Sequence, residues 1–233
     1  SKQSINQKYF DQLSAAGAEV RWSDPAFTYM HAKVLVVDEA LSVVSTGNYL
    51  ASQMKKERNY VARDDDPDDV ADLVALFDAD WEKLTPDLSC TRLLVSPVNA
   101  RERLLAFIQG AQSTLEIESM QLADTQVRAA LVDRKEAGVA IRALLADPTW
   151  IDANADAAAF LAQNAIPARY QVAPAVHVKS IIADGERAYL GSENLSYTSL
   201  TKNREVGVIL SEPAAVKTIR DTFEKDWATG KTF

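Results

Sequence analysis

The sequence predicts an α/β fold built from two copies of one α-β-α sandwich, with mixed, mostly parallel sheets related by a pseudo-two-fold axis. Two observations predict it. The chain contains only two histidines, His31 and His177, and they begin two similar stretches, HAKVLVVDEALSVVSTGNYL and HVKSIIADGERAYLGSENLS. Strand-like runs also alternate with amphipathic runs along the whole chain, which is typical of α/β sandwiches. Two copies are too few for a solenoid, so we interpret them as a duplicated domain, with repeats over residues 1–92 and 93–233.

The expected helices and strands follow one another in a regular order. Amphipathic runs predict helices at Ile5–Ala16, Asp68–Lys83, Ala100–Gln109, Thr125–Glu136, Ala153–Asn164 and Pro213–Trp227. Apolar runs bounded by turn residues predict strands at Glu19–Trp22, Ala32–Val37, Leu41–Ser45, Tyr60–Arg63, Arg92–Ser96, Thr114–Ser119, Ala140–Ala146, Ala168–Val172, Val178–Ala183, Arg187–Leu190 and Glu205–Leu210. The pair Asp184-Gly185 lies between two apolar runs and predicts a hairpin.

The first copy is shorter than the second. The second begins near Leu93 and has 84 residues before its histidine, whereas the first has 30. Nothing in the first copy matches Leu93–Ala146, which should form three strands and two helices, and a sheet without those strands would have an open edge. We therefore expect the native protein to have an additional N-terminal segment of about this size, in the same chain or as a separate chain. A naturally shortened first copy is the alternative.

Composition and charge exclude several classes of protein. Hydrophobic residues make up 47% of the chain and charged residues 25%, close to globular averages, so a disordered or fibrous protein is excluded. No apolar run reaches the roughly 18–20 residues that span a bilayer. Cys90 is the single cysteine, which excludes an internal disulfide framework and a multi-cysteine metal site. The net charge of −8 argues against a protein that coats nucleic acid.

Each copy supplies a set of polar side chains that suits a phosphate group. Residues two apart share one face of a strand, so each histidine points the same way as the lysine two positions later. A hydroxyl and an amide, again two apart, follow the second strand of each hairpin. An ammonium group supplies positive charge, and the amide and hydroxyl supply neutral donors. The two sets are His31, Lys33, Thr46 and Asn48 in the first copy and His177, Lys179, Ser192 and Asn194 in the second.

The pattern H-x-K-x4-D-x6-G-S/T-x-N, present twice, resembles the paired motifs of the phospholipase D superfamily, in particular its cardiolipin synthase-like and bacterial phospholipase D-like members. The second copy matches at every motif position, including Gly191. The first copy has Ser45 in place of glycine and Thr46 in place of serine. The motif aspartates, Asp38 and Asp184, have the opposite strand parity to the lysines, so we expect them to brace the hairpins rather than to touch substrate.

The resemblance implies a metal-independent phosphodiesterase that uses no cofactor. One histidine attacks phosphorus to form a phosphohistidine, and the other protonates the leaving group. The implied catalytic residues are His31, Lys33, Asn48, His177, Lys179, Asn194 and Glu205, with the phosphate bound by Thr46, Ser192 and the motif lysines and asparagines. Asp38, Asp184 and Gly191 are implied to be structural. The two copies are expected to pack so that the two histidines face each other across one cleft.

The roles of the two histidines depend on their neighbours. Glu205 matches a family position whose carboxylate holds an imidazole, and the first copy has Asn59 there, with Glu57 two residues earlier as a substitute. A carboxylate favours the imidazolium form and raises a histidine pKa, whereas an amide gives no such help. We therefore predict that Glu205 holds His177 as the general acid and that His31, beside Asn59, is the nucleophile. The alternative is that the carboxylate orients the nucleophile, as in serine protease triads.

Three functions remain open on the sequence. The leading one is hydrolysis of phospholipid headgroups or their transfer to an acceptor alcohol, with peripheral membrane contact. The alternatives are a nuclease of the same superfamily and a catalytically silent binding module. For a bacterial protein of this kind the compartment stays open, with export or a membrane-peripheral location as the expectation.

Several residues near the motifs have two interpretations each. Basic side chains cluster there, and they either guide an anionic headgroup or nucleic-acid backbone or are ordinary surface charge: Lys55, Lys56, Arg58, Lys202 and Arg204. Glu118 either resembles an acidic position near the site of some lipid-acting relatives or is a strand-end carboxylate. Trp150 and Tyr197 either line a substrate pocket or pack in loops.

Overall fold

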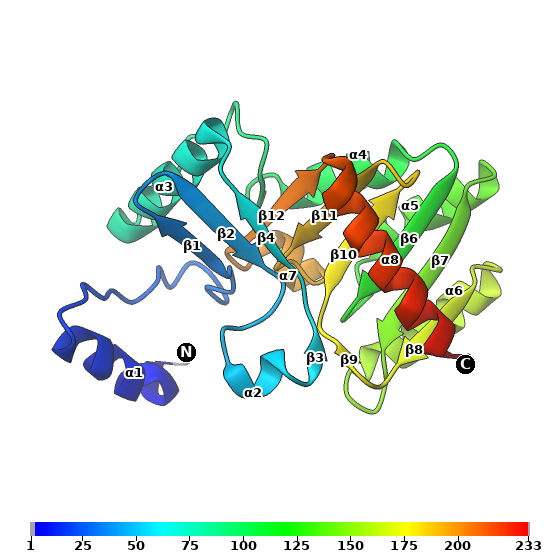
Figure 1. Cartoon of the computed structure of the whole chain (residues 1–233), viewed down its shortest axis with the longest axis horizontal. Coiled ribbons are helices and arrows are strands. Elements are labelled where there is room, and N and C mark those ends of the chain that lie inside the picture. Colours follow the sequence, from blue (N-terminus) through cyan, green and yellow to red (C-terminus); the bar gives the residue numbers. More distant parts are fainter. Residues whose placement is uncertain (1–2, 233) are drawn as a thin grey trace.

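The structure, a computed structural model, describes residues 3–232 (Figure 1). The helices are α1 (Gln3–Ala15), α2 (Ala51–Met54), α3 (Pro67–Glu82), α4 (Ala100–Gln109), α5 (Thr125–Glu136), α6 (Ala153–Gln163), α7 (Tyr197–Thr201) and α8 (Pro213–Thr229). The strands are β1 (Val34–Val37), β2 (Leu41–Ser45), β3 (Glu57–Arg58), β4 (Val61–Asp64), β5 (Leu94–Ser96), β6 (Thr114–Ser119), β7 (Ala140–Ala146), β8 (Ala168–Gln171), β9 (Ala175–Val176), β10 (Lys179–Ala183), β11 (Arg187–Gly191), β12 (Glu205–Leu210) and β13 (Lys231–Thr232).

The large sheet is built from the second half of the chain. Its eight strands lie in the order β13-β8-β7-β6-β10-β11-β12-β5. Strands β6, β7 and β8 pair in parallel, since the helices α5 and α6 carry the chain back across the sheet between them. Strands β10 and β11 form the predicted hairpin, whose turn residues Asp184 and Gly185 both have positive φ, 58° and 69°. Such a turn matches the twist of the flanking strands.

The first half of the chain forms a small sheet, and two short backbone pairings connect this half to the second. The small sheet is antiparallel, in the order β1-β2-β4. A short parallel ladder joins β3 of the first half to β9 of the second, pairing Glu57 with Ala175 and Arg58 with Val176. An isolated parallel bridge between Met30 and Arg204 links the halves a second time. These two links lie directly beside the two histidines in sequence.

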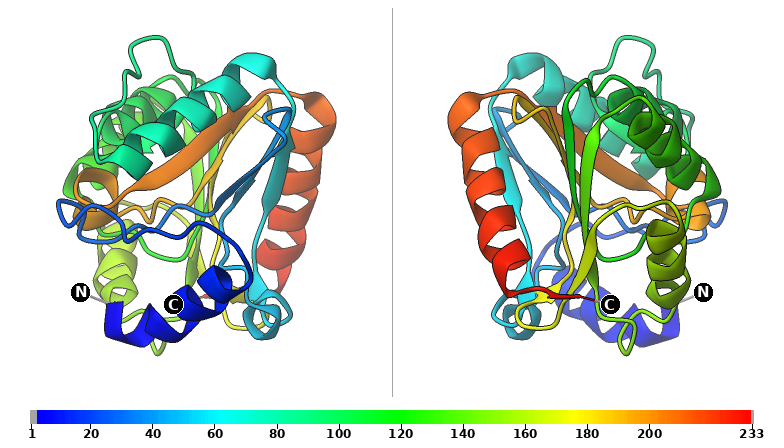
Figure 2. Two further views of the ribbon diagram at one scale, coloured as in Figure 1. Left: turned by 90° about the vertical axis from the view of Figure 1, so that its left-hand side faces the viewer. Right: turned by 90° about the vertical axis from the view of Figure 1, so that its right-hand side faces the viewer.

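Helices cover both faces of the large sheet. Figure 2 shows α8 on one face and α4 and α5 on the other. The main core lies under α4, α5 and α6 and includes Leu104, Leu131 and Leu161. A second core is shared by the halves, because Val44 of the small sheet packs in the same cluster as Val206 of the large one. The two sheets therefore belong to one packed unit.

Equivalent helices of the two copies have different surroundings. α3 and α8 begin at Pro67 and Pro213, 146 residues apart, the same offset as the two histidines. Phe223 of α8 is 1% exposed and packs in a cluster with Leu144 of the large sheet, whereas its equivalent in α3, Phe77, is 60% exposed. Within residues 3–232, no strand pairs with the outer edge of β1, and α1 buries none of its side chains.

The mixed α/β fold is confirmed, and two of the predictions made for it differ from the structure. Antiparallel ladders outnumber parallel ones where mostly parallel sheets were predicted, because crossover helices join only β6 to β7 and β7 to β8. The predicted strand at Glu19–Trp22 is wrong, since this segment is irregular. The equivalent segment of the second copy leads into β8, which is paired by β7, and the described first copy has no strand equivalent to β7.

Candidate active site

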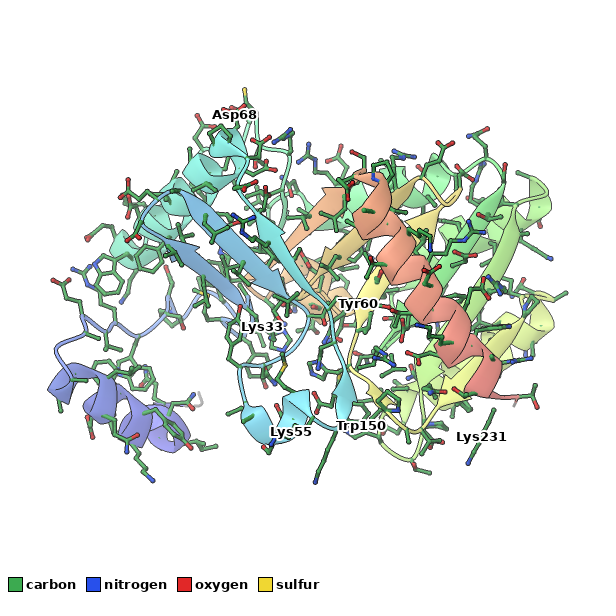
Figure 3. The ribbon with its side chains drawn as sticks, viewed as in Figure 1. Lys33, Lys55, Tyr60, Asp68, Trp150 and Lys231 are labelled. Atoms are coloured by element: carbon green, nitrogen blue, oxygen red, sulfur yellow. The ribbon has the colours of Figure 1, made fainter. Side chains whose placement is uncertain are left out.

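The two histidines lie at the boundary between the small and the large sheet. His31 precedes β1, and His177 lies between β9 and β10, so each comes just before the first strand of a hairpin. The lysines two positions later, Lys33 and Lys179, are 7% and 0% exposed. Figure 3 shows Lys33 at the start of β1 and Tyr60 at the start of β4, where the small sheet meets the large one. Both motifs therefore lie at one boundary, where the two halves of the chain pack together.

His31 is held by a carboxylate from the other copy. Its Nδ1 lies 2.7 Å from Oε2 of Glu205, a fully buried residue of β12. The other carboxylate oxygen accepts hydrogen bonds from Ser199 Oγ at 2.6 Å and Asn203 Nδ2 at 2.9 Å. Burial alone would raise the pKa of Glu205, but its hydrogen bonds with His31, Ser199 and Asn203 bring that pKa below its usual value. Glu205 is therefore ionised, and the prediction that it holds His177 is wrong.

His177 is held by an amide from the other copy. Its Nδ1 lies 3.0 Å from Oδ1 of Asn59. Thr46 Oγ1 donates to the same amide oxygen at 3.0 Å, and the amide nitrogen donates to Glu57 Oε2 at 3.4 Å, so the orientation of the amide is fixed. Glu57 Oε2 lies 4.0 Å from the His177 Nδ1. Both residues that the sequence offered as partners of His31, Asn59 and Glu57, therefore lie beside His177 instead. The predicted pairings fail because the segment after each motif crosses to the histidine of the other copy.

Positive charges from both copies act on His177. Its pKa is lowered to about 3 by burial and then by the charges of Lys179, Lys33 and His31. Lys179 Nζ lies 3.1 Å from the His177 Nδ1 and donates to the Thr46 carbonyl at 3.1 Å. Burial also lowers the pKa of Lys33 to about 8 and that of Lys179 well below its usual value. Both motifs therefore contribute to one electrostatic site.

The motif hydroxyls are turned into the protein. Thr46 Oγ1 accepts a hydrogen bond from the backbone N–H of Tyr60 at 2.9 Å, and Ser192 Oγ accepts one from Val206 N–H at 3.1 Å. Both residues are 0% exposed. Their hydroxyls hold the neighbouring strands, which differs from the phosphate-binding role expected from the sequence.

The motif amides are better placed for a ligand. Asn48 and Asn194 are both half-buried. Asn48 Nδ2 donates to Gln53 Oε1 at 3.2 Å. Asn194 Oδ1 is buried and has no hydrogen-bond partner within residues 3–232. An unpartnered buried amide oxygen is costly, so this side chain is available for a further contact.

Gly191 leaves room for a buried acid. A Cβ at Gly191 would lie 2.2 Å from Glu193 Oε2 and 2.7 Å from the Cα of Gly207, so no larger residue fits. Glu193 is fully buried, and its Oε2 accepts a hydrogen bond from Tyr189 Oη at 2.8 Å. Burial and then the charge of Glu205 raise the pKa of Glu193 to about 8. Glu193 is therefore largely protonated at neutral pH.

The first copy has Gly47 at the position of Glu193. A Cβ at Gly47 would lie 2.4 Å from Cγ of Asn59. The glycine therefore gives Asn59 the space in which it reaches His177.

The motif aspartates lie in the hairpin turns. Asp184 Oδ1 accepts the backbone N–H groups of Gln112, Ser113 and Thr114 at 3.1, 2.6 and 3.0 Å, which fixes the turn before β6. Asp38 has a similar positive φ, 52°, and lines a cavity of about 800 Å³ beside α3. Asp184 thus braces the hairpin, as predicted.

Two aromatic side chains flank the site. The ring of Trp150 stacks with that of His177, with centroids 6.2 Å apart, and Trp150 remains 42% exposed. Tyr49 Oη donates to the Lys33 carbonyl at 3.3 Å, and this side chain is 48% exposed. Trp150 therefore lines the approach to the site, and Tyr49 is a residue that the sequence analysis missed. Tyr197 lies at the start of α7, largely exposed.

Within residues 3–232, no three His, Cys, Asp or Glu side chains converge as ligands for a metal ion. Nor does any helix of that part combine the length and apolar character needed to cross a bilayer.

Comparison with known proteins identifies the family. The family model described as "Cardiolipin synthase, PLD-like domain" matches residues 1–81 and 104–227, which is most of the chain. The chain belongs to the phospholipase D superfamily. The chain is similar to the mitochondrial cardiolipin hydrolase of Danio rerio, with 26% identity over 127 residues, 54% of this chain and 56% of that protein. The chain thus spans about half the length of that relative.

Solved structures share the phospholipase D fold. The crystal structure of Nuc from Salmonella typhimurium, a phospholipase D family member, has a TM-score of 0.56 and 24% identity, and the match covers 60% of this chain and 95% of Nuc. Phosphatidylserine synthase from Haemophilus influenzae Rd KW20 has a TM-score of 0.71 and 12% identity, with coverage of 97% and 69%. At these identities the likeness shows the fold.

Proposed function

We propose that the chain is a metal-independent phosphodiesterase or phosphatidyltransferase of phospholipase D type that acts on phospholipid headgroups. The observation that carries this proposal is the arrangement of two imidazoles and two lysines from opposite halves of the chain around one site. Each imidazole is oriented at Nδ1, by Glu205 or by Asn59, which leaves Nε2 for chemistry. Family membership supports phosphodiester chemistry, and the substrate is the further step that we propose.

In the first half of the reaction, His31 Nε2 attacks phosphorus and the bond to the leaving alcohol breaks. The new P–N bond makes the imidazole cationic, and the ionised Glu205 at 2.7 Å stabilises that charge. The carboxylate therefore acts on the nucleophile, so His31 keeps the proposed role for a different reason from the one given by the sequence. His177 Nε2 donates a proton to the departing oxygen.

In the second half, His177 removes a proton from water or an alcohol, which attacks phosphorus while the P–N bond breaks. The covalent intermediate splits one difficult displacement into two easier ones. Lys33 and Lys179 would hold the phosphate oxygens, and Asn48 and Asn194 would donate from their amides. A bound phosphate anion offsets the lysine charges that hold the pKa of His177 at about 3, and so favours its protonated form.

Three observations favour a phospholipid over nucleic acid. The relative from Danio rerio is named a cardiolipin hydrolase. The net charge of −8 disfavours a polyanionic strand as substrate. Large apolar side chains lie exposed near the site, including Trp150 and Tyr49. An aromatic side chain with one apolar and one polar end is suited to a lipid–water interface.

The test is turnover of defined substrates in EDTA. The protein is incubated with vesicles of phosphatidylcholine, phosphatidylglycerol or cardiolipin, with and without ethanol, and separately with single-stranded DNA. We expect release of the lipid headgroup, a phosphatidylethanol product when transfer occurs, and loss of both in His31→Ala and His177→Ala. Cleavage of DNA alone would support the nuclease instead. Inactivity on every substrate would support the binding module.

The histidine roles are tested by trapping the intermediate. A slow turnover is quenched and the phosphorylated peptide is mapped. Phosphate is expected on His31, and it should accumulate in His177→Ala with a substrate whose leaving group needs no proton. Phosphate on His177 would reverse the two roles.

A further inference from the structure

Two consecutive residues of the first half hold His177 of the second half. The backbone N–H of His177 donates to the carbonyl of Arg58 at 3.1 Å, while Asn59 binds the ring. The side chain of Arg58 continues to helix α8, where Nε and Nη2 donate to the two oxygens of Asp226 at 2.5 and 2.9 Å. Arg58 thus ties the backbone of His177 to a helix of the same half as that histidine.

The same arrangement holds His31 from the opposite side. The backbone N–H of His31 donates to the carbonyl of Arg204 at 2.9 Å, while Glu205 binds the ring. The side chain of Arg204 reaches helix α3, where Nε and Nη2 donate to Oδ1 of Asp80 at 3.1 and 2.9 Å. A further bond from Nη1 to the Ser96 carbonyl, 3.0 Å, fixes the guanidinium plane.

The two arrangements are related by the repeat. Arg58 and Arg204 are 146 residues apart, as are Asp80 and Asp226 and the two histidines. Each arginine leaves its own half and contacts both the histidine and the terminal helix of the other half. The arginine–aspartate contact is present in both copies, although the helices α3 and α8 differ in their surroundings. What the two copies have in common is the site of the two histidines, so we relate the contact to that site.

These arginines are not available for steering a substrate. Arg204 and Asp80 have side chains only 3% and 13% exposed, and Asp226 is 5% exposed beside Arg58. Of the basic residues that cluster near the motifs, these two are therefore committed to ion pairs inside the protein. The Arg58–Asp226 pair is bidentate, which makes it strong and directional. In either pair, losing one partner leaves the other charge largely buried.

We propose that Arg58 and Arg204 are positioning residues, each of which, anchored by Asp226 or Asp80, sets the place of the catalytic histidine in the opposite half. The ion pair acts on the histidine through the main chain. Each arginine supplies the carbonyl that accepts the histidine N–H, and the residue after it, Asn59 or Glu205, contacts the ring. The two anchors are separate, so each histidine can be displaced without the other.

The chain offers a direct readout, because it has two histidines and no more. In protein labelled with 13C-histidine, the two imidazoles give two sets of resonances whose pH titrations are followed separately. His31→Gln identifies the signals. Asp226→Asn is expected to shift the resonances and pKa of His177 clearly more than those of His31. Asp80→Asn is expected to do the reverse.

A matched control is available between strands β6 and β7, beside the same helix α8. The pair Arg142–Glu116 has side chains 29% and 5% exposed, against 30% and 5% for Arg58–Asp226, and Arg142 also binds Glu224 of α8. Glu116→Gln should change neither histidine signal. Arg58→Lys keeps the positive charge but removes the bidentate hydrogen bonds to Asp226. It is measured in parallel, so that the proposal can still be tested if Asp226→Asn fails to fold. We expect Arg58→Lys to move the His177 signal in the same direction, by less.

The kinetic readout rests on the proposed function, whereas the resonance readout does not. With an alkyl leaving group, Asp226→Asn should lower kcat about 10- to 100-fold, the order expected for a displaced catalytic group. With p-nitrophenol as leaving group, which needs no proton, the first burst of p-nitrophenol released by Asp226→Asn should keep a rate within about threefold of the wild type, because only the later attack of water on the intermediate needs His177. Asp80→Asn should slow both this burst and the turnover of the alkyl substrate.

Equal shifts of both histidines in Asp226→Asn, or no shift beyond that of Glu116→Gln, would overturn the positioning role. Selective shifts in a protein that turns over no phosphodiester would keep the positioning role and reject the proposed function.

Discussion

Glu205 and Asn59 occupy equivalent positions in the two copies but give the two histidines different chemistry. Glu205 is ionised and touches His31, whereas Asn59 is neutral and touches His177. A carboxylate stabilises a cationic imidazole, which is what the nucleophile becomes when the P–N bond forms. An amide fixes the tautomer without holding the proton on the ring, which suits a group that must release it.

Replacing the carboxylate of Glu205 by an amide tests whether its negative charge assists His31. In Glu205→Gln the hydrogen-bond geometry to Ser199 is largely kept, but the negative charge beside His31 is lost. We expect kcat to fall by about 10²- to 10⁴-fold with little change in KM, following the behaviour of a triad aspartate. Steady-state kinetics on lipid vesicles measures it, with circular dichroism as the check on folding. A kcat within a few-fold of wild type would mean that Glu205 does not assist His31.

Glu193 adds a pH dependence to stability. Its pKa is about 8 in the folded protein and 4.5 in the unfolded chain, so between these values the unfolded state releases a proton that the folded state keeps. The folded state therefore loses stability as the pH rises from about 4.5 to about 8. Glu193→Gln removes this dependence because the amide resembles the protonated acid.

Urea denaturation at pH 4, 6 and 8 checks this expectation. The free energy of unfolding of Glu193→Gln, relative to wild type, should rise steadily across the three pH values. A constant difference would show that Glu193 is ionised in the folded protein. Both proteins keep Glu118, a second buried acid with a pKa near 8, so its contribution cancels in the comparison.

At the level of elements, α3 and α8 provide an internal comparison of burial. Phe77 and Phe223 hold the same position in the two helices but are 60% and 1% exposed. Phe223→Ala should cost about 3–5 kcal/mol of unfolding free energy, through lost burial and a cavity. Phe77→Ala should stay within about 0.5 kcal/mol, as for an exposed side chain. Chemical denaturation of the two variants gives both values, and a large loss in Phe77→Ala would mean that another surface covers α3.

The elements that the sequence predicted well are those with a long local pattern. The helices Ala100–Gln109 and Thr125–Glu136 and the strands Thr114–Ser119 and Ala140–Ala146 have the bounds expected from their apolar periodicity. The ladder of β3 and β9 has two residues in each strand, and it exists only because the two halves meet there. No local pattern predicts such a contact.

The same limit applies to the site. The motif spacing predicted which residues gather, since strand parity places His31 beside Lys33 and His177 beside Lys179. It did not predict that the segment after each motif crosses to the other histidine, because this depends on how the halves pack. The hydroxyls of Thr46 and Ser192 likewise face inward, because each accepts a backbone N–H group from a residue later in the chain, Tyr60 or Val206.

At the level of the whole molecule, the first half depends on the second. Val44 of β2 packs with Val206 of β12 in one cluster, and each histidine takes its ring partner from the opposite half. The second half also has a separate core under α4, α5 and α6, built entirely from its own residues. The two halves should therefore differ in their ability to fold alone.

Dividing the chain after residue 92 tests this dependence. We expect residues 93–233 to fold cooperatively on their own, as judged by circular dichroism and a sigmoidal urea transition, and residues 1–92 to remain unfolded. Neither piece should cleave a phosphodiester. Within the isolated second half, His177 loses the cover of the first half and the charges of Lys33 and His31, which are among the causes of its low pKa. Its pKa should rise from about 3 toward 6.5, as followed by the titration of this single histidine, whereas a value still near 3 would show that Lys179 and the second half alone set it.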